Sequence, residues 1–387
     1  MTSQDWSVPE TEVLGAVREA CTSDRRAVLA TIVRVEGSAY RRPGTKMLID
    51  GDGDGVGSLT AGCLEDEVRS LAASVLESGR PRLERFDLSG DDDVWGLGIG
   101  CNGVIDIFLE PLTDTLEPPL SVVDDGGDCT VVTVLESEDA AFARGDRAYY
   151  HADAGEFREL SGTWPDDVTA RLEESASALA PAGTAETVTI DRGGSAVTLF
   201  LDGIAAPPEL VVFGSGHDVA PVVRLATLAD FRVIVVGFRG AVATSDRFPA
   251  ADRTVSTAPA RIRETLELDE RTYAVVMSHN FVDDRLALDE LVRSPVPYVG
   301  LMGPSKRFEE MLEAFAEEDR TFTEAELASV YTPIGLDLGS ETPHQIAMSI
   351  VSEALAVHND RSPAHLRDRD GALHDRADIE LDDPPQQ

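Results

Sequence analysis

The sequence predicts an α/β protein in two parts, and three observations lead to this prediction. From residue 209 onward, short apolar runs alternate with amphipathic segments, as strands and helices do around a parallel sheet. The first of these runs ends in Gly214-Ser215-Gly216, directly before a helix-like stretch. The part of the chain before residue 209 contains an internal sequence repeat. We therefore expect a duplicated N-terminal α/β domain, followed by a Rossmann-like domain with a doubly wound parallel sheet.

The expected domain boundaries follow the composition. The N-terminal domain covers residues 1–203, a linker with Ala-Ala-Pro-Pro occupies residues 204–208, and the Rossmann-like domain covers residues 209–358. The polar, charged and proline-containing residues 359–387 are expected to form a disordered tail, because they offer too little apolar surface to fold.

Two copies of one α/β unit are expected in the N-terminal domain, at about residues 27–111 and 129–201. The matched segments are 30–33 with 132–135, 42–46 with 143–147, and 59–63 with 160–164. The second copy has Trp164 where the first has Cys63, and it lacks a counterpart of the segment Gly100-Cys101-Asn102-Gly103. We therefore expect the first copy to carry the chemistry and the second to be structural.

Local patterns predict the individual elements in order. The N-terminal ones are a helix over 8–20, a strand over 27–35, a turn over 51–57, a helix over 63–78 and a strand over 103–109. The helix over 63–78 is expected because Leu64, Val68, Leu71 and Val75 recur at a helical period. In the second domain, strands are expected over 210–213, 232–238, 254–256, 273–278 and 298–302, and helices over 219–229, 260–268, 284–293, 305–317 and 343–357.

The composition excludes some classes of function. The net charge is −38 over 387 residues, and Lys46 and Lys306 are the only lysines, so a nucleic-acid partner is not expected. The acid is spread along the chain, which favours a surface adapted to a salt-rich cytoplasm over a single acidic binding region. No apolar run is long enough to cross a bilayer, and the N-terminus lacks the pattern of a signal peptide. A cytoplasmic protein is expected.

Four cysteines without a close pair argue against a disulfide scaffold and against a zinc ribbon. Cys63 precedes the helix expected over 63–78, where the helix dipole favours a thiolate, and Glu65 is placed to accept a proton. Cys101 lies among glycines that permit close approach by a ligand. The alternatives are a buried cysteine at a helix cap for Cys63 and an inert thiol in a bulged hairpin for Cys101.

Basic and glycine-rich segments are the candidates for holding an anion. Arg41, Arg42 and Lys46 suit a phosphate or a carboxylate, and a solvated face paired with acids is the alternative. In the second domain the candidates are the glycine turn with its neighbours, a later basic residue, the segment after the fourth strand, and a turn before a helix. They are Gly214, Gly216, His217, Asp218, Arg239, His279, Asp284, Gly303 and Lys306.

The glycine turn does not match the usual dinucleotide fingerprint. Its sixth position is Val219 rather than Gly or Ala, and Gly237 stands where an acidic residue that binds ribose is expected. The carboxylate of Asp218 would also repel a pyrophosphate. Ordinary use of NAD(P) is therefore disfavoured.

Several motifs together resemble the XdhC/CoxI family. In the N-terminal domain they are residues 30–44, Ala61-Gly62-Cys63-Leu64-Glu65 and Gly100-Cys101-Asn102-Gly103. In the second domain they are residues 214–218 with Pro221, and residues 279–284, 298–304 and 335–343. The resemblance extends from about residue 27 to residue 357.

The resemblance implies a protein that handles the molybdenum cofactor, as molybdopterin or a dinucleotide form. Family members are accessory proteins that help sulfurate the cofactor and insert it into xanthine dehydrogenase or a related molybdenum hydroxylase. This implies a hydroxylase client, a cysteine desulfurase partner, a homodimer, and an accessory chaperone rather than a turnover enzyme. Cys63 or Cys101 would contact molybdenum, with Gly62, Asn102 and Gly103 beside them. An NAD(P)-dependent oxidoreductase and a scaffold without chemistry of its own are the alternatives.

Overall fold

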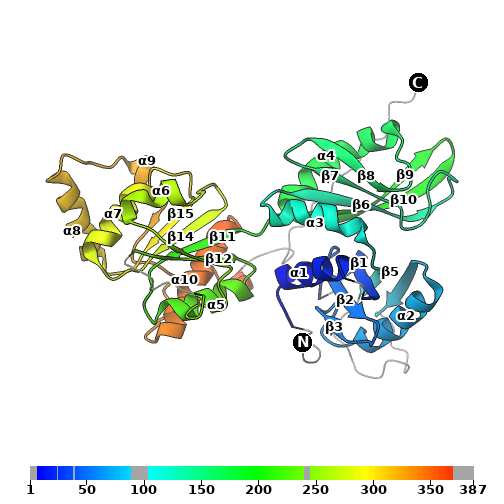
Figure 1. Ribbon diagram of the computed structural model, residues 1–387, viewed down its shortest axis with the longest axis horizontal. Helices are drawn as coiled ribbons and strands as arrows, with labels where there is room; N and C mark the ends of the chain where they lie inside the picture. Colours follow the sequence, from blue (N-terminus) through cyan, green and yellow to red (C-terminus); the bar gives the residue numbers. More distant parts are fainter. Residues whose placement is uncertain (1–6, 24, 38–39, 89–102, 239–244, 369–387) are drawn as a thin grey trace. The chain divides into compact units, whose positions relative to one another are not determined.

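The computed structural model describes residues 7–23, 25–37, 40–88, 103–238 and 245–368. The chain forms two compact units, Met1–Ala206 and Pro207–Gln387 (Figure 1). Both units are built from strands and helices, which confirms the predicted α/β class. No helix within the described ranges is both long and apolar enough to span a bilayer.

The first unit contains two five-stranded antiparallel sheets with the same strand order. One sheet has the order β3-β2-β1-β5-β4, from β1 (Ala27–Gly37), β2 (Lys46–Asp50), β3 (Gly55–Val56), β4 (Arg82–Asp87) and β5 (Gly103–Pro111). The other has the order β8-β7-β6-β10-β9, from β6 (Cys129–Ser137), β7 (Arg147–His151), β8 (Glu156–Ser161), β9 (Ala185–Arg192) and β10 (Ser195–Ile204). Each sheet and its helix is one copy of the same unit, and we call them the first and the second copy.

Helix α2 packs on the first of these sheets and helix α4 on the second, and the two helices end in the same way. Helix α2 (Glu65–Ser78) buries Val68, Ala72 and Val75, which share one face because they are four and three residues apart. It ends at Gly79, whose φ of 65° is a left-handed conformation that glycine adopts without strain. Helix α4 (Asp166–Ala182) ends in the same way at Gly183, with φ of 56°. Helices α1 (Glu10–Cys21) and α3 (Glu117–Asp124) complete the unit.

The second unit is built around a six-stranded parallel sheet with the order β13-β12-β11-β14-β15-β16. The strands are β11 (Glu209–Phe213), β12 (Arg232–Gly237), β13 (Arg253–Ser256), β14 (Thr272–Val276), β15 (Tyr298–Leu301) and β16 (Val330–Tyr331). Because the chain moves outward from β11 to β13 and then returns to β14, the strand order reverses between β11 and β14. Such a switch point is where doubly wound sheets bind their ligands, beyond the carboxyl ends of the strands.

Helices cover both faces of this sheet (Figure 1). Helices α5 (Val219–Leu228) and α10 (Pro343–His358) contribute to one hydrophobic core. Helices α6 (Ile262–Thr265), α7 (Phe281–Leu291) and α8 (Ser305–Ala316) contribute to the other. The fold therefore agrees with the predicted doubly wound domain. A short helix, α9 (Glu324–Leu327), lies between α8 and β16.

Some elements differ from the predictions. The helix expected over residues 260–268 is a 3-10 turn, Pro259–Arg261, followed by the single turn of α6, because the backbone becomes extended at Leu266 and buries that side chain. Strands β3 and β16 were not expected, since two residues are too few to display a period. The predicted disordered tail is described only as far as residue 368, and residues 369–387 lie outside the described ranges.

Candidate functional site

A tight turn at the start of α2 holds the first candidate nucleophile. The Thr60 hydroxyl accepts hydrogen bonds from the N–H groups of Cys63 (3.1 Å) and Leu64 (3.3 Å). It donates to the carboxylate of Glu65, at 2.7 and 2.8 Å from the two oxygens. The same carboxylate accepts from the backbone N–H groups of Thr60 (2.8 Å) and Leu64 (3.1 Å). The hydrogen bonds of Glu65 therefore hold the shape of the turn.

Gly62 leaves this turn open beside Cys63. Its φ is 108°, and a Cβ built there meets no atom within 4 Å. Ala61 and Gly62 are exposed, while Cys63 is half-buried and packs its inner side against the hydrophobic core of the first copy. The thiol is thus fixed at the edge of the core, next to backbone that a ligand can approach closely.

The equivalent turn of the second copy is closed. Trp164, which replaces Cys63, is 4% exposed and packs edge-on against Phe142 at 5.6 Å between ring centroids. Its indole N–H donates to the carbonyl of Ser161 (3.1 Å). A Cβ on Gly162 would lie 2.6 Å from the carboxylate of Asp146. The turn that can receive a ligand is therefore the one with the thiol.

The other two described cysteines are held as thiols. Burial raises the pKa of Cys21 to about 11 and that of Cys129 to about 12. At neutral pH neither forms the reactive thiolate. Cys101 and Asn102 lie outside the described residues, so their expected approach to Cys63 stays a prediction. Gly103 opens β5 and pairs with Gly37 of β1.

The three cations of the predicted basic cluster point to different partners. Arg41 lies over the ring of Tyr40 (5.7 Å) and contacts the Ser58 hydroxyl (3.5 Å). Arg42 forms an exposed ion pair with Glu10 (3.2 Å). Lys46 instead points into the unit, as described next. The structure therefore does not bring the three side chains together.

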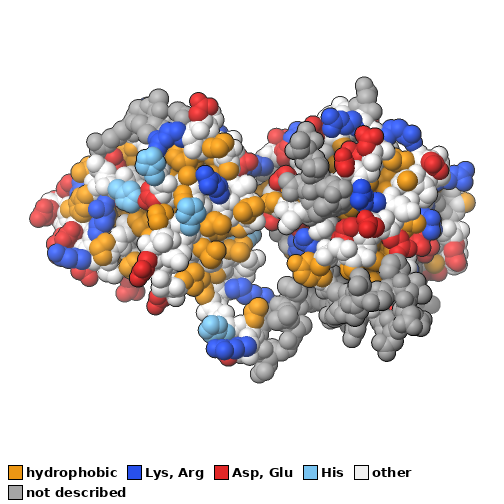
Figure 2. Space-filling view, turned by 90° about the horizontal axis from the view of Figure 1, so that it is seen from below, with side chains coloured by type: hydrophobic (Ala, Val, Ile, Leu, Met, Phe, Trp, Pro, Cys, Tyr) orange, Lys and Arg blue, Asp and Glu red, His pale blue; other side chains and the backbone are white. Residues whose placement is uncertain are grey.

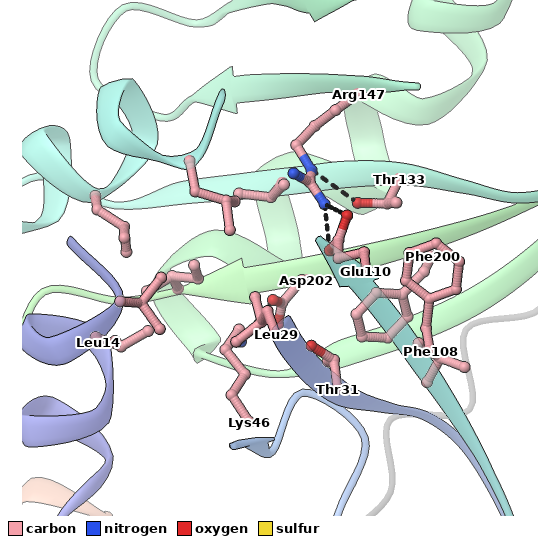
Figure 3. A pocket seen from close by; sticks show the side chains of 16 residues that line it. Leu14, Leu29, Thr31, Lys46, Phe108, Glu110, Thr133, Arg147, Phe200 and Asp202 are labelled. Carbon is pink, nitrogen blue, oxygen red and sulfur yellow. Dashed lines mark hydrogen bonds and ion pairs between the residues drawn. The ribbon is translucent and has the colours of Figure 1, made fainter. Parts of the chain in front are cut away.

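Lys46 belongs to a pair of crossed ion pairs between the two copies (Figure 3). Lys46 of the first copy lies 2.6 Å from Asp202 of the second, and Arg147 of the second lies 2.6 Å from Glu110 of the first. The pairs are equivalent, because Leu29 pairs with Glu110 across β1 and β5 as Val131 pairs with Asp202 across β6 and β10. A cavity of about 20 Å³ lies between them, too small for any ligand larger than water.

In the second unit, the carboxyl ends of β11 and β14 carry a carboxylate–imidazole pair. Asp218 Oδ2 lies 2.6 Å from His279 Nε2. His279 has a φ of 58°, a left-handed conformation that is uncommon outside glycine and that often marks functional loops. Gly214 permits the two strand ends to come close, because a Cβ there would lie 2.6 Å from the carbonyl oxygen of Met277.

A buried network fixes the loop that carries His279. The Asp284 carboxylate is 1% exposed and accepts hydrogen bonds from the N–H and the hydroxyl of Ser278. It also forms an ion pair with Arg307 of α8 (2.7 Å). Asn280 caps α7 by accepting from the N–H groups at 282 and 283. Through these contacts, Asp284 holds the loop that carries His279 in position.

The remaining predicted residues of the second unit are at the surface or outside the described ranges. His217 is exposed, and Lys306 forms an exposed pair with Glu310 (3.4 Å). Gly303, with φ of 131°, makes room for the Arg307 side chain. Arg239 is not among the described residues. Figure 2 shows histidine side chains gathered on one face of this unit. The described residues contain no group of three or more His, Cys, Asp or Glu arranged to hold a metal ion.

Sequence reasoning missed Arg247, which lies at the glycine turn. Its guanidinium donates to the carbonyl of Ser215 (2.7 Å) and is exposed. The segment 245–250 lies between β12 and β13 without a regular element, so no period indicated its position. The positive charge of Arg247, in a chain with a net charge of −38, was the feature that could have indicated it.

The fold and these sites define a two-part protein, with a cysteine turn in a duplicated α/β unit and a carboxylate–imidazole pair in a Rossmann-type unit. Family models agree: residues 20–87 match the XdhC and CoxI family, and residues 210–354 match the XdhC Rossmann domain. A relative from Bacillus subtilis (strain 168), named as a probable xanthine dehydrogenase subunit, is 30% identical over 85% of this chain and 92% of its own length. The chain therefore belongs to the XdhC and CoxI family.

Two further proteins are similar to this chain. The molybdenum cofactor insertion chaperone PaoD of Escherichia coli (strain K12) is 33% identical over 107 residues, which is 27% of this chain and 32% of that protein. A crystal structure described as a xanthine dehydrogenase from Bacillus halodurans has a TM-score of 0.70 and 27% identity, and the match covers 90% of this chain and 96% of that one.

Proposed function

We propose that this protein binds the molybdenum cofactor as cargo, helps to sulfurate it, and inserts it into a molybdenum hydroxylase of the xanthine dehydrogenase or CO dehydrogenase type. The observation that carries the proposal is the open turn of the first copy, where Gly62 gives access to Cys63. Thiolate is a ligand that suits molybdenum–sulfur chemistry, and the matched turn of the second copy is closed by Trp164.

Two relatives support this choice of cargo. PaoD is named a molybdenum cofactor insertion chaperone, and the name of the Bacillus subtilis relative refers to xanthine dehydrogenase. A hydroxylase client and a cysteine desulfurase as the source of sulfur would be the partners. The protein acts in this proposal as an accessory chaperone in the cytoplasm, in the form of a homodimer.

The cofactor combines a phosphate, a pterin and a metal centre, and different residues suit different parts. Cys63, and Cys101 if it lies beside it, would contact the metal. The half-buried Arg41 is a cation that suits the phosphate or the nucleotide of a dinucleotide form. Lys46 is not assigned to the cargo, because its ammonium group is paired with Asp202.

The test is retention of the cofactor by purified protein in high salt. Pterin is measured by fluorescence after oxidation, molybdenum by elemental mass spectrometry, and transfer by activation of an apo-hydroxylase. We expect the wild type to retain the cofactor and activate the client, and Cys63→Ala to retain pterin but lose activation. Cys21→Ala is the matched control and is expected to behave as the wild type.

Two results would contradict the proposal. If no form retains pterin and the wild type binds NADPH, an NAD(P)-dependent oxidoreductase becomes the better interpretation of the second unit. If no form retains pterin and Cys63→Ala supports client activation as well as the wild type, the protein acts as a scaffold between other factors.

A further inference from the structure

The carboxylate of Asp218 occupies the glycine turn where a dinucleotide fold would place a pyrophosphate. It immediately precedes α5, whose N-terminus is the phosphate-binding end in such folds. A Cβ added to Gly216 would collide with this carboxylate, so the side chain lies over the turn itself. Within the described ranges, Asp218 has no arginine or lysine partner. A phosphate placed there would meet the negative charge of this carboxylate.

The same carboxylate and His279 form a ready pair of hydrogen-bond acceptors. Asp218 does not cap α5 with its side chain, so its oxygens are not used by the helix. When His279 donates from Nε2 to Asp218, a neutral imidazole presents Nδ1 as an acceptor. The side chains of His279 and Asp218 are 54% and 29% exposed, so a ligand can reach both.

The pair is also held in place, as a recognition element must be. His279 keeps its left-handed backbone between Ser278, which is bound to Asp284, and Asn280, which caps α7. It lies at the switch point between β11 and β14, the expected ligand position in this fold. The loop is therefore built before any ligand arrives.

We propose that the Asp218–His279 pair receives the hydrogen-bond-donor edge of the pterin ring, and that the glycine turn does not hold the phosphate. The inference rests on the proposed function and assigns the pterin ring of the cofactor to the Asp218–His279 pair. A pterin carries an amino group and a ring N–H side by side, which match a carboxylate as the two N–H groups of a guanidinium do. The phosphate then lies outside the glycine turn, away from the Asp218 carboxylate.

The experiment is a binding titration of the full chain with three probes: a phosphate-free reduced pterin, inorganic pyrophosphate and the intact molybdenum cofactor. The proteins are the wild type, Asp218→Asn, His279→Asn and Glu270→Gln. Asparagine at 279 keeps the left-handed backbone at little cost. Glu270→Gln is the matched control, because it removes one exposed carboxylate just before β14, at the opposite edge of the sheet.

We expect Asp218→Asn to weaken binding of the phosphate-free pterin by about tenfold or more, since a charge-assisted contact is lost. His279→Asn weakens it less, Glu270→Gln leaves it unchanged, and pyrophosphate does not compete with it. The inference is overturned if Asp218→Asn binds pterin as the wild type does, or if it binds the intact cofactor more tightly, because the phosphate then occupies the turn.

The titration separates this inference from the proposed function. If the wild type and Asp218→Asn retain the intact cofactor equally, the proposed function stands and the assignment of the pterin edge fails. If the wild type retains neither the intact cofactor nor the free pterin, both fail together.

Discussion

The ammonium group of Lys46 lies 2.6 Å from the carboxylate of Asp202, which joins the two copies of the first unit through residues far apart in the chain. The two side chains are only 12% and 9% exposed. Burial raises the pKa of Asp202, and the nearby Lys46 opposes that shift. The ion pair therefore connects β2 of the first copy with β10 of the second.

Loss of one member of this pair is expected to destabilise the first unit. Lys46→Met leaves the Asp202 carboxylate buried without its cation, which costs about 3 kcal/mol. The double variant Lys46→Met/Asp202→Leu should recover most of that loss, because no buried charge remains. Urea unfolding followed by tryptophan fluorescence measures this unit alone, since Trp6, Trp95 and Trp164 all lie in it. A single variant as stable as the wild type would contradict the prediction.

Glu186 of β9 is expected to make the first unit less stable as the pH rises. Burial raises the pKa of its carboxyl above the usual value, and Oε2 has no hydrogen-bond partner among the described residues. The folded state therefore holds this proton more tightly than the unfolded state, and stability falls as pH increases from the ordinary pKa through the raised one. Glu186→Gln should gain stability relative to the wild type as the pH rises above the ordinary carboxyl pKa of about 4.3. A difference that stays constant with pH would rule this out.

The three described cysteines are expected to differ in their reaction with iodoacetamide. Burial raises the pKa of Cys21 to about 11 and that of Cys129 to about 12, so at pH 8 both should be modified more slowly than Cys63. Labelling of Cys21 should accelerate about tenfold per pH unit below its pKa, as its thiolate fraction does. Peptide mass spectrometry over time measures each site. Labelling of Cys129 as fast as Cys63 in folded protein would be the contrary result.

Asp284→Asn is expected to destabilise the second unit and to loosen the loop at His279. The change removes the buried charge that holds Arg307 and Ser278, at a cost of about 3 kcal/mol. Thermal unfolding by circular dichroism measures the loss, and hydrogen exchange at residues 278–281 measures the loosening. Glu310→Gln removes an exposed partner of Lys306 and should change stability by less than about 0.5 kcal/mol. Equal effects of the two variants would contradict this.

The fold class was predictable because its signals are local and repeated. In the second unit, the continuous apolar runs of fully buried strands such as β11 and β14 alternate with amphipathic helices, and the predicted parallel sheet is confirmed. The one-turn helix α6 was overpredicted, since the same apolar spacing also fits a turn followed by extended chain at Leu266.

The directions of charged side chains were harder to predict. Arg41, Arg42 and Lys46 are close in sequence, yet Lys46 turns inward because its partner Asp202 is supplied by the other copy. The sequence match between residues 42–46 and 143–147 aligned Lys46 with Arg147, and the two residues form equivalent ion pairs. Extending the same match to Glu110 and Asp202 would have predicted both ion pairs between the copies.

The closed turn at Trp164 has a consequence for how sequence change is tolerated. The second copy supplies interior packing without needing an accessible thiol, so its turn is constrained only by the need to stay filled. Under the proposed function, the first copy must instead keep a gap beside Cys63 while remaining folded. Among relatives, we therefore expect a large side chain to be kept at position 164, and a residue as small as glycine to be kept at position 62.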